Sequence, residues 1–135
     1  MTFALLWRRD GQRPDADSVE GLSLGLTRLR AAPLDGWRRG PLAVWWFADD
    51  PWFSVAEHPA GFVAILAGRL DARQDTLTRL GLATPTGEPV TDADLLAAAY
   101  ERWGRACFGQ LVGEFAAILW HPAQGTLACA RDRVG

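Results

Sequence analysis

The chain has 135 residues, 49% of them hydrophobic and 22% charged, which is enough apolar length for one globular core. Its formal net charge of -2 excludes the broad basic field that would hold nucleic acid or an anionic membrane. All 14 basic residues are arginine, so the chain has no lysine for a Schiff base or a phosphate-binding loop.

The first third of the chain predicts one strand, one helix and a long connection. Residues 3–7 form an apolar run typical of a buried strand, whereas residues 8–17 contain glycine and proline and predict a loop. Apolar side chains recur three and four positions apart over residues 18–29, which predicts a helix. Residues 31–40 are interrupted by proline and glycine and predict a connection without regular structure.

Three short strands are predicted next, over residues 42–48, 52–56 and 62–67. The turns between them are short and contain proline, glycine or paired aspartates. Strands joined in this way are typical of an antiparallel meander.

A second helix is predicted to start at Asp71 as its N-cap, with Gln74 in the capping-box position. Leu77 and Leu80 share one face of this helix, and Gly81 suits its C-terminal cap.

Residues 83–90 are rich in proline, threonine and glycine and predict a loop, after which Thr91 is expected to cap a third helix. The apolar face of this helix has the spacing of three and four that a helix requires. Its members are Leu95, Leu96, Ala99, Tyr100, Trp103 and Cys107.

A hairpin of two strands, residues 112–120 and 126–131, is predicted to end the chain. No repeat or linker divides the sequence. We therefore predict a single domain over residues 1–135, of α+β class, with mostly antiparallel strands and about three helices.

Several segments, in order, resemble the glutaminase domain of asparagine synthetases and their relatives. The most specific is Gly-Arg-Leu-Asp-Ala-Arg at residues 68–73, which is similar to the Gly-Arg-Leu-Asp-Asn-Arg of that family. Further blocks are residues 7–14, 91–104, 111–120 and 130–135. Their order and spacing match the family from about Phe62 onward, and residues before Pro51 match only loosely.

The resemblance implies a class II glutamine amidotransferase domain with the fold of N-terminal-nucleophile hydrolases. That fold is a sandwich of two antiparallel sheets flanked by helices. Relatives continue beyond the last residues of this chain, so we expect a fragment or a product truncated at the C-terminus.

The family hydrolyses glutamine with an N-terminal cysteine whose own α-amine acts as the base. Here the second residue is Thr2, and no cysteine lies near the start. Thr2 is therefore either an ordinary N-terminal residue or a substituted nucleophile. A hydroxyl is a far weaker nucleophile than a thiolate near neutral pH, so the change should cost much of the rate.

The family's oxyanion hole combines an Asn side chain with the backbone N–H of the following Gly. The matching pair here is Ala67 and Gly68, so Gly68 is a remnant donor and the Asn amide is missing. Loss of one such donor costs on the order of 10²–10³ in rate.

The family also binds the substrate carboxylate with a strand arginine, and here that position falls on Phe47 or Ala48. Neither side chain can make charge-assisted hydrogen bonds to a carboxylate. Asp92 matches the aspartate that receives the substrate α-ammonium. It either retains that role or only complements the dipole of its helix. With nucleophile, amide and arginine all absent, we predict that the domain does not hydrolyse glutamine.

Other chemistry-bearing residues favour structural roles. His58 and His121 each precede a proline and lack a partner at metal-ligand spacing. Cys107 and Cys129 are predicted to be buried, inert thiols, and two cysteines without a signal peptide favour a reducing cytoplasm. Residues 131–133, Arg-Asp-Arg, predict an internal salt-bridged turn or, alternatively, a contact to a neighbouring domain or an anion.

Seven tryptophans give the chain large apolar surfaces. Trp45 and Trp46 are adjacent in a predicted strand and must point to opposite faces. If one of them is exposed beside Trp52, it marks a surface for a partner.

The resemblance implies that the parent protein is an ATP-dependent amide-forming enzyme of the asparagine synthetase superfamily. Members without the cysteine resemble macrolactam-forming enzymes such as lasso-peptide cyclases and β-lactam synthetases, which capture an activated carboxylate with an amine of the substrate itself. This chain has no Ser-Gly-Gly-rich pyrophosphate loop. No cofactor is therefore expected in it; ATP and Mg would bind to a synthetase domain, its expected partner, together with a peptide substrate.

Two other hypotheses stay open. The chain is an active glutamine-hydrolysing asparagine synthetase domain with a misassigned start, which a Met-Cys-Gly start upstream would support. Alternatively, it is a free-standing, non-enzymatic module that binds a partner, which a 135-residue protein without a longer form in cells would support.

Overall fold

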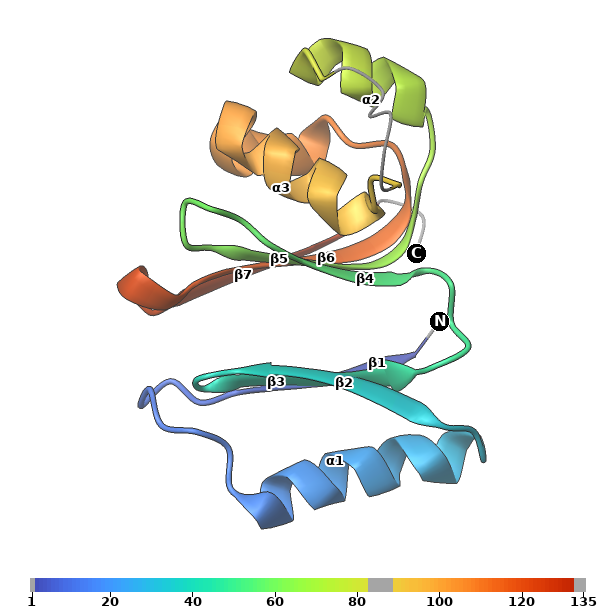
Figure 1. Ribbon diagram of the computed structural model, residues 1–135, viewed down its shortest axis with the longest axis vertical. Helices are drawn as coiled ribbons and strands as arrows, with labels where there is room; N and C mark the ends of the chain where they lie inside the picture. Colours follow the sequence, from blue (N-terminus) through green and yellow to red (C-terminus); the bar gives the residue numbers. More distant parts are fainter. Residues whose placement is uncertain (1, 83–88, 133–135) are drawn as a thin grey trace. The chain divides into compact units, whose positions relative to one another are not determined.

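The computed structural model describes residues 2–82 and 89–132. These residues form two compact units that divide between Pro51 and Trp52 (Figure 1). The loop predicted at residues 83–90 and the last block of the family resemblance fall partly outside the described residues.

The first unit is a three-stranded antiparallel sheet with one helix. Its elements are β1 (Phe3–Trp7), α1 (Ala16–Leu29), β2 (Leu34–Arg39) and β3 (Leu42–Phe47). The strand order is β1-β3-β2, so β3 lies in the centre and pairs Val44 with Leu5 on one side and Trp37 on the other. Helix α1 lies against one face of this sheet (Figure 1).

Helix α1 begins two residues before the predicted range, because Asp15 caps it. The Asp15 carboxylate accepts a hydrogen bond of 2.8 Å from the backbone N–H of Ser18, which satisfies one of the free donors at the helix start. Strand β2 was not predicted at all, since its sequence Leu-Asp-Gly-Trp-Arg-Arg has a glycine and three charges. Its strand conformation depends on pairing with β3 along its whole length.

Gly36 of β2 makes room for a tryptophan. It pairs with Trp45 of β3, and a Cβ atom at Gly36 would lie 3.0 Å from the Trp45 ring. Trp45 packs with Leu26 of α1 and is 6% exposed, whereas Trp46 points to the opposite face, as predicted for adjacent strand residues.

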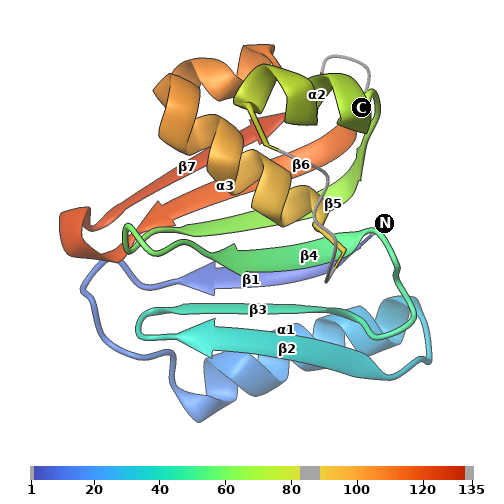
Figure 2. The same cartoon turned by 45° about the horizontal axis from the view of Figure 1, so that its top comes forward.

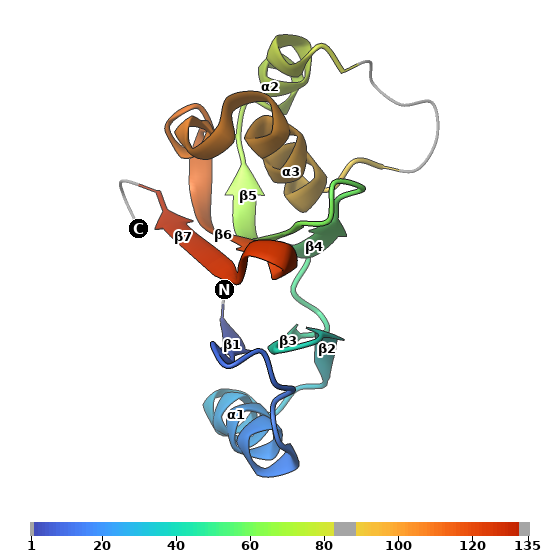
Figure 3. The same cartoon turned by 90° about the vertical axis from the view of Figure 1, so that its left-hand side faces the viewer.

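The second unit is a four-stranded antiparallel sheet in the order β4-β5-β6-β7 (Figure 2). The strands are β4 (Phe53–Glu57), β5 (Val63–Leu70), β6 (Gly113–His121) and β7 (Thr126–Arg131). Two helices, α2 (Arg73–Leu80) and α3 (Asp92–Trp103), cover one face of this sheet (Figure 3). Short 3-10 turns, η1 (Gly104–Gly109) and η2 (Pro122–Gln124), follow α3 and β6.

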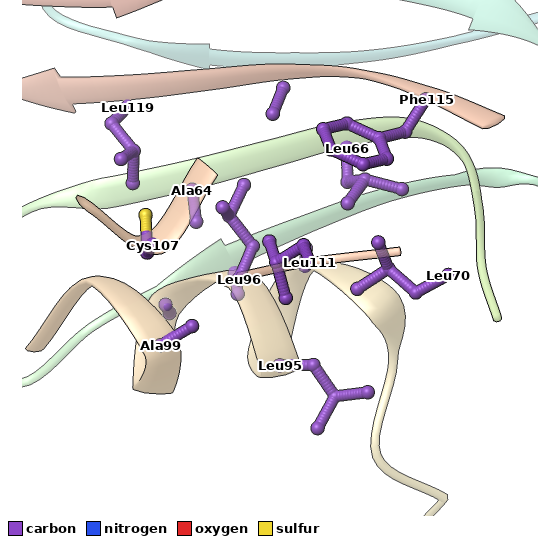
Figure 4. Packing of buried hydrophobic residues seen from close by; sticks show 14 of the residues in the cluster. Ala64, Leu66, Leu70, Leu95, Leu96, Ala99, Cys107, Leu111, Phe115 and Leu119 are labelled. Atoms are coloured by element: carbon purple, nitrogen blue, oxygen red, sulfur yellow. The ribbon is translucent and has the colours of Figure 1, made fainter. Parts of the chain in front are cut away.

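The core of the second unit lies between α3 and the sheet. Figure 4 shows Leu96 and Leu111 packed against Leu66 and Phe115 of the central strands. Helix α3 ends at Trp103, so Cys107, predicted to lie on its apolar face, reaches the same core from η1. The predicted cap is confirmed, because Thr91 and Asp94 form a reciprocal capping box.

The predicted cap of α2 is wrong. The N-cap residue is Ala72, whose backbone is left-handed at φ 51 and ψ 37, and no side chain caps the helix. Asp71 instead forms an ion pair of 3.4 Å with Arg69. Ala72 stands where the family motif has Asn, a residue that tolerates this conformation better than alanine does.

The predicted α+β class is confirmed, since the described residues form two antiparallel sheets with helices. Among the described residues, no helix combines the length and the apolar character needed to cross a membrane.

Candidate functional site

Thr2 is exposed and lies directly before β1. It lines an open pocket of about 460 Å³ together with the end of α1 and the segment that follows β3. The other lining residues are Leu29, Arg30, Phe47, Asp49, Asp50 and Pro51, so the pocket belongs entirely to the first unit.

An arginine that the sequence analysis missed lies in this pocket. Arg30 forms an ion pair with Asp49, and its guanidinium lies 4.2 Å from the centre of the Phe47 ring. Phe47 is one of the two positions where the family's carboxylate-binding arginine was expected, whereas Ala48 is exposed and donates its N–H to Pro33. No local pattern marks Arg30, because it approaches Phe47 from a different element.

Gly68 lies in β5, and its N–H is already engaged. The N–H donates a hydrogen bond of 2.7 Å to the carbonyl oxygen of Trp52, which extends the pairing of β4 with β5 by one residue. At Gly68 φ is 129°, and a Cβ atom there would overlap the carbonyl oxygen of Glu114 and lie 2.7 Å from the Phe115 Cα. Close approach of β5 and β6 therefore requires glycine at this position, whatever its role in chemistry.

Asp92 is the first residue of α3 and its side chain is 12% exposed. Its Oδ2 accepts a hydrogen bond of 2.8 Å from the Leu70 backbone N–H, and its Oδ1 forms an ion pair with Arg73. One carboxylate oxygen thus accepts a hydrogen bond from the end of β5, and the other has an ion-pair partner at the start of α2.

Gly68 and Asp92 lie close to the same end of β5, because Leu70 lies two residues after Gly68 and donates to Asp92. Thr2 belongs to the other unit. Of the three predicted site residues, the second unit therefore brings two together.

The histidines pack on a phenylalanine. His58 stacks on Phe62 at 4.5 Å and lies 3.3 Å from Glu101, while His121 stacks on Phe62 at 5.2 Å and lies 3.0 Å from the Tyr100 hydroxyl. Because Nδ1 of His58 accepts a hydrogen bond from a backbone N–H, its proton lies on Nε2. In residues 2–82 and 89–132, no group of three potential ligands could hold a metal ion.

Neither cysteine has the lowered pKa of a reactive thiol. Burial raises the pKa of the Cys107 thiol to about 11. Cys129 lies on the edge strand and is exposed, contrary to the prediction, and partial desolvation raises the pKa of its thiol as well.

Asp132, in the middle of the Arg-Asp-Arg triplet, bonds the end of β7 to Phe115 of β6. Its carboxylate accepts a hydrogen bond of 2.8 Å from the Phe115 N–H, and its own N–H donates to the Phe115 carbonyl oxygen. These bonds anchor the end of β7 to β6. Trp52, at the start of the second unit, is 51% exposed.

A family model described as a glutamine amidotransferase domain matches residues 49–135. The chain belongs to this family. The match to the glutamine amidotransferase domain spans the helices and strands from β4 to β7, and it includes Gly68 and Asp92 but not Thr2. No curated protein sequence matches the chain.

Proposed function

We propose that this glutamine amidotransferase domain is degenerate and does not hydrolyse glutamine. The observation that carries the proposal is the hydrogen bond of 2.7 Å between the Gly68 N–H and the Trp52 carbonyl oxygen. A donor that is saturated in the ground state cannot stabilise an oxyanion without first breaking that bond. Ala67 stands where the family has the Asn amide donor, and the Gly68 N–H is engaged. Neither member of this residue pair therefore offers a free donor to an oxyanion.

The nucleophile and the substrate anchors support the same proposal. Thr2 offers a hydroxyl where the reaction uses a thiolate, and no described thiol has a lowered pKa. At the expected carboxylate anchor, Phe47 is apolar, and nearby Arg30 is paired with Asp49. The ammonium anchor, Asp92, is paired with Arg73.

A domain without glutaminase chemistry fits a parent that needs no ammonia. We propose that the parent is a cytoplasmic, ATP-dependent amide-forming enzyme of the asparagine synthetase superfamily that joins a carboxylate to an amine of the same substrate, as macrolactam-forming peptide cyclases do. ATP and Mg would bind to its synthetase domain. The glutamine amidotransferase domain would cover the synthetase domain and shape its site for a peptide substrate.

The direct test is glutamate release by the purified full chain with L-glutamine, measured by coupled oxidation of glutamate. We expect no release above the background without protein. Steady release that a Thr2→Ala variant abolishes would overturn the proposal.

A restoration series sharpens this test. The variants Thr2→Cys, Ala67→Asn and the double variant replace the missing nucleophile and amide, and mass spectrometry checks that residue 2 is terminal. We expect all three to stay inactive, because the Gly68 N–H and the Asp92 carboxylate remain engaged. Steady turnover by the double variant would contradict the argument from Gly68.

A further inference from the structure

The corner between β5, α2 and α3 is held by one arginine. Arg73 is the first residue of α2, and its guanidinium contacts Asp92 through Nη1 and the Val90 carbonyl oxygen through Nη2. The left-handed conformation of Ala72 precedes it and sets the direction in which α2 starts. The Arg73 side chain thus contacts two acceptors at the start of α3, the Asp92 carboxylate and the Val90 carbonyl oxygen.

The two partners differ in exposure. The Asp92 side chain is 12% exposed, whereas that of Arg73 is 40% exposed. A carboxylate buried this deeply requires a cation or strong donors, because desolvation without them is costly. Among residues 2–82 and 89–132, Arg73 provides the cation that lies within 4.0 Å of Asp92.

Helix capping does not explain this arrangement of Asp92. The N–H groups of the first turn of α3 have other partners: Ala93 donates to the Ser54 hydroxyl at 3.0 Å, and Asp94 donates to the Thr91 hydroxyl at 3.2 Å. The Asp92 carboxylate is turned away from its own helix, toward Leu70 and Arg73. The Asp92 carboxylate and the Val90 carbonyl oxygen thus form a site for a cation, and the side chain of Arg73 occupies this site.

We propose that Arg73 is an internal occupant of a cation site and excludes the ammonium group of an amino acid from Asp92. The inference rests on the proposed function, because it gives the reason why the retained aspartate does not bind substrate. The planar guanidinium contacts the Asp92 carboxylate and the Val90 carbonyl oxygen through two separate nitrogens, which the single nitrogen of an ammonium group matches less well. Removal of the Arg73 side chain creates a vacant site for small planar cations that donate hydrogen bonds.

The test is chemical rescue of the full-length Arg73→Ala variant. We expect its melting temperature to fall by roughly 5 °C, and about 10 mM methylguanidinium chloride to restore roughly half of the loss in a saturable manner. Sodium chloride at equal ionic strength and tetramethylammonium, which has no N–H, should restore nothing. If the variant does not fold alone, the yield of folded protein after refolding with methylguanidinium serves as the same measurement.

Arg79→Ala is the matched control. Arg79 lies in the last turn of α2, bonds to Gln110 and lies 5.0 Å from the centre of the Trp103 ring. No carboxylate of residues 2–82 or 89–132 forms an ion pair with its guanidinium. We expect no rescue of Arg79→Ala, and none of the double variant Arg73→Ala/Asp92→Asn. Absence of saturable rescue, or equal rescue of Arg79→Ala, would overturn the inference, whereas glutamate release by the wild-type chain would overturn only the proposed function.

Discussion

Helices α1 and α3 have similar lengths but are held in very different ways. Of the 14 described residues of α1, Leu26 alone is buried, whereas five of the 12 described residues of α3 are buried. The first turn of α3 is also bonded to β4 through Ser54 and to β5 through Leu70. Both helices follow an apolar period of three to four residues, so the period predicts a helix but not how firmly the fold holds it.

This difference also distinguishes the candidate residues of the first unit from those of the second. The end of α1 contributes Arg30 to an open pocket beside Thr2, whereas the start of α3 contributes Asp92 to a closed corner. The family match covers α3 and not α1. Asp92, the candidate residue within the family match, thus also helps to hold the second unit together.

The largest expected effect is on the core of α3. Leu96 is completely buried, so Leu96→Ala should lower the free energy of unfolding by about 3 kcal/mol through lost transfer energy and a cavity. Leu24 of α1 is 48% exposed, and Leu24→Ala should change the free energy of unfolding by less than about 0.5 kcal/mol. Urea denaturation of both variants measures the difference, and equal losses would contradict the contrast between the helices.

A smaller effect of opposite sign is expected in α1. Gly25 is exposed, and a Cβ atom there would meet no atom within 4 Å. Gly25→Ala should therefore stabilise the chain by up to about 1 kcal/mol, the difference in helix propensity. Gly104, the C-cap of α3, has equally open surroundings but a φ of 57°.

Gly104→Ala is therefore the control for backbone conformation alone, and it should destabilise by about 1 kcal/mol. Thermal denaturation of the two variants should give shifts of opposite sign. A stabilising Gly104→Ala would show that a glycine with positive φ is not required at this cap.

The smallest effect is a pH dependence of α1. The hydrogen bond from the Ser18 N–H lowers the pKa of the Asp15 carboxyl from 3.8, so the charged form stabilises the folded state above that pH. This contribution should disappear as pH falls below 3.8 through the lower pKa of the folded state. Asp15→Asn keeps a capping side chain that does not titrate.

Urea midpoints of the wild type and Asp15→Asn should therefore keep a constant difference from about pH 7 to pH 5 and converge at lower pH. A difference that stays constant below pH 3 would show that the Asp15 charge contributes nothing.

Sequence reasoning located Gly68 and Asp92 but not the bonds they make. The motif around residues 68–73 identified Gly68, since short blocks of residue types are visible in one dimension, but it gave Arg73 no role. The engagement of the Gly68 N–H by Trp52 was not visible, because it arises between strands whose register the sequence does not encode locally. The pairing of Arg73 with Asp92 depends in the same way on two separate helices meeting at one strand end.

The sequence by itself determined the elements whose signals are local: the apolar face and Thr91 cap of α3, and the short turns that separate β3, β4 and β5. Only the tertiary structure decided that Leu-Asp-Gly-Trp-Arg-Arg becomes strand β2 and that Ala72 rather than Asp71 is the N-cap residue of α2. A strand's hydrogen bonds come from residues distant in sequence, and a left-handed cap persists only where the surrounding packing compensates its strain. These long-range contacts, rather than the residue types, give Gly68 and Asp92 their partners within the chain.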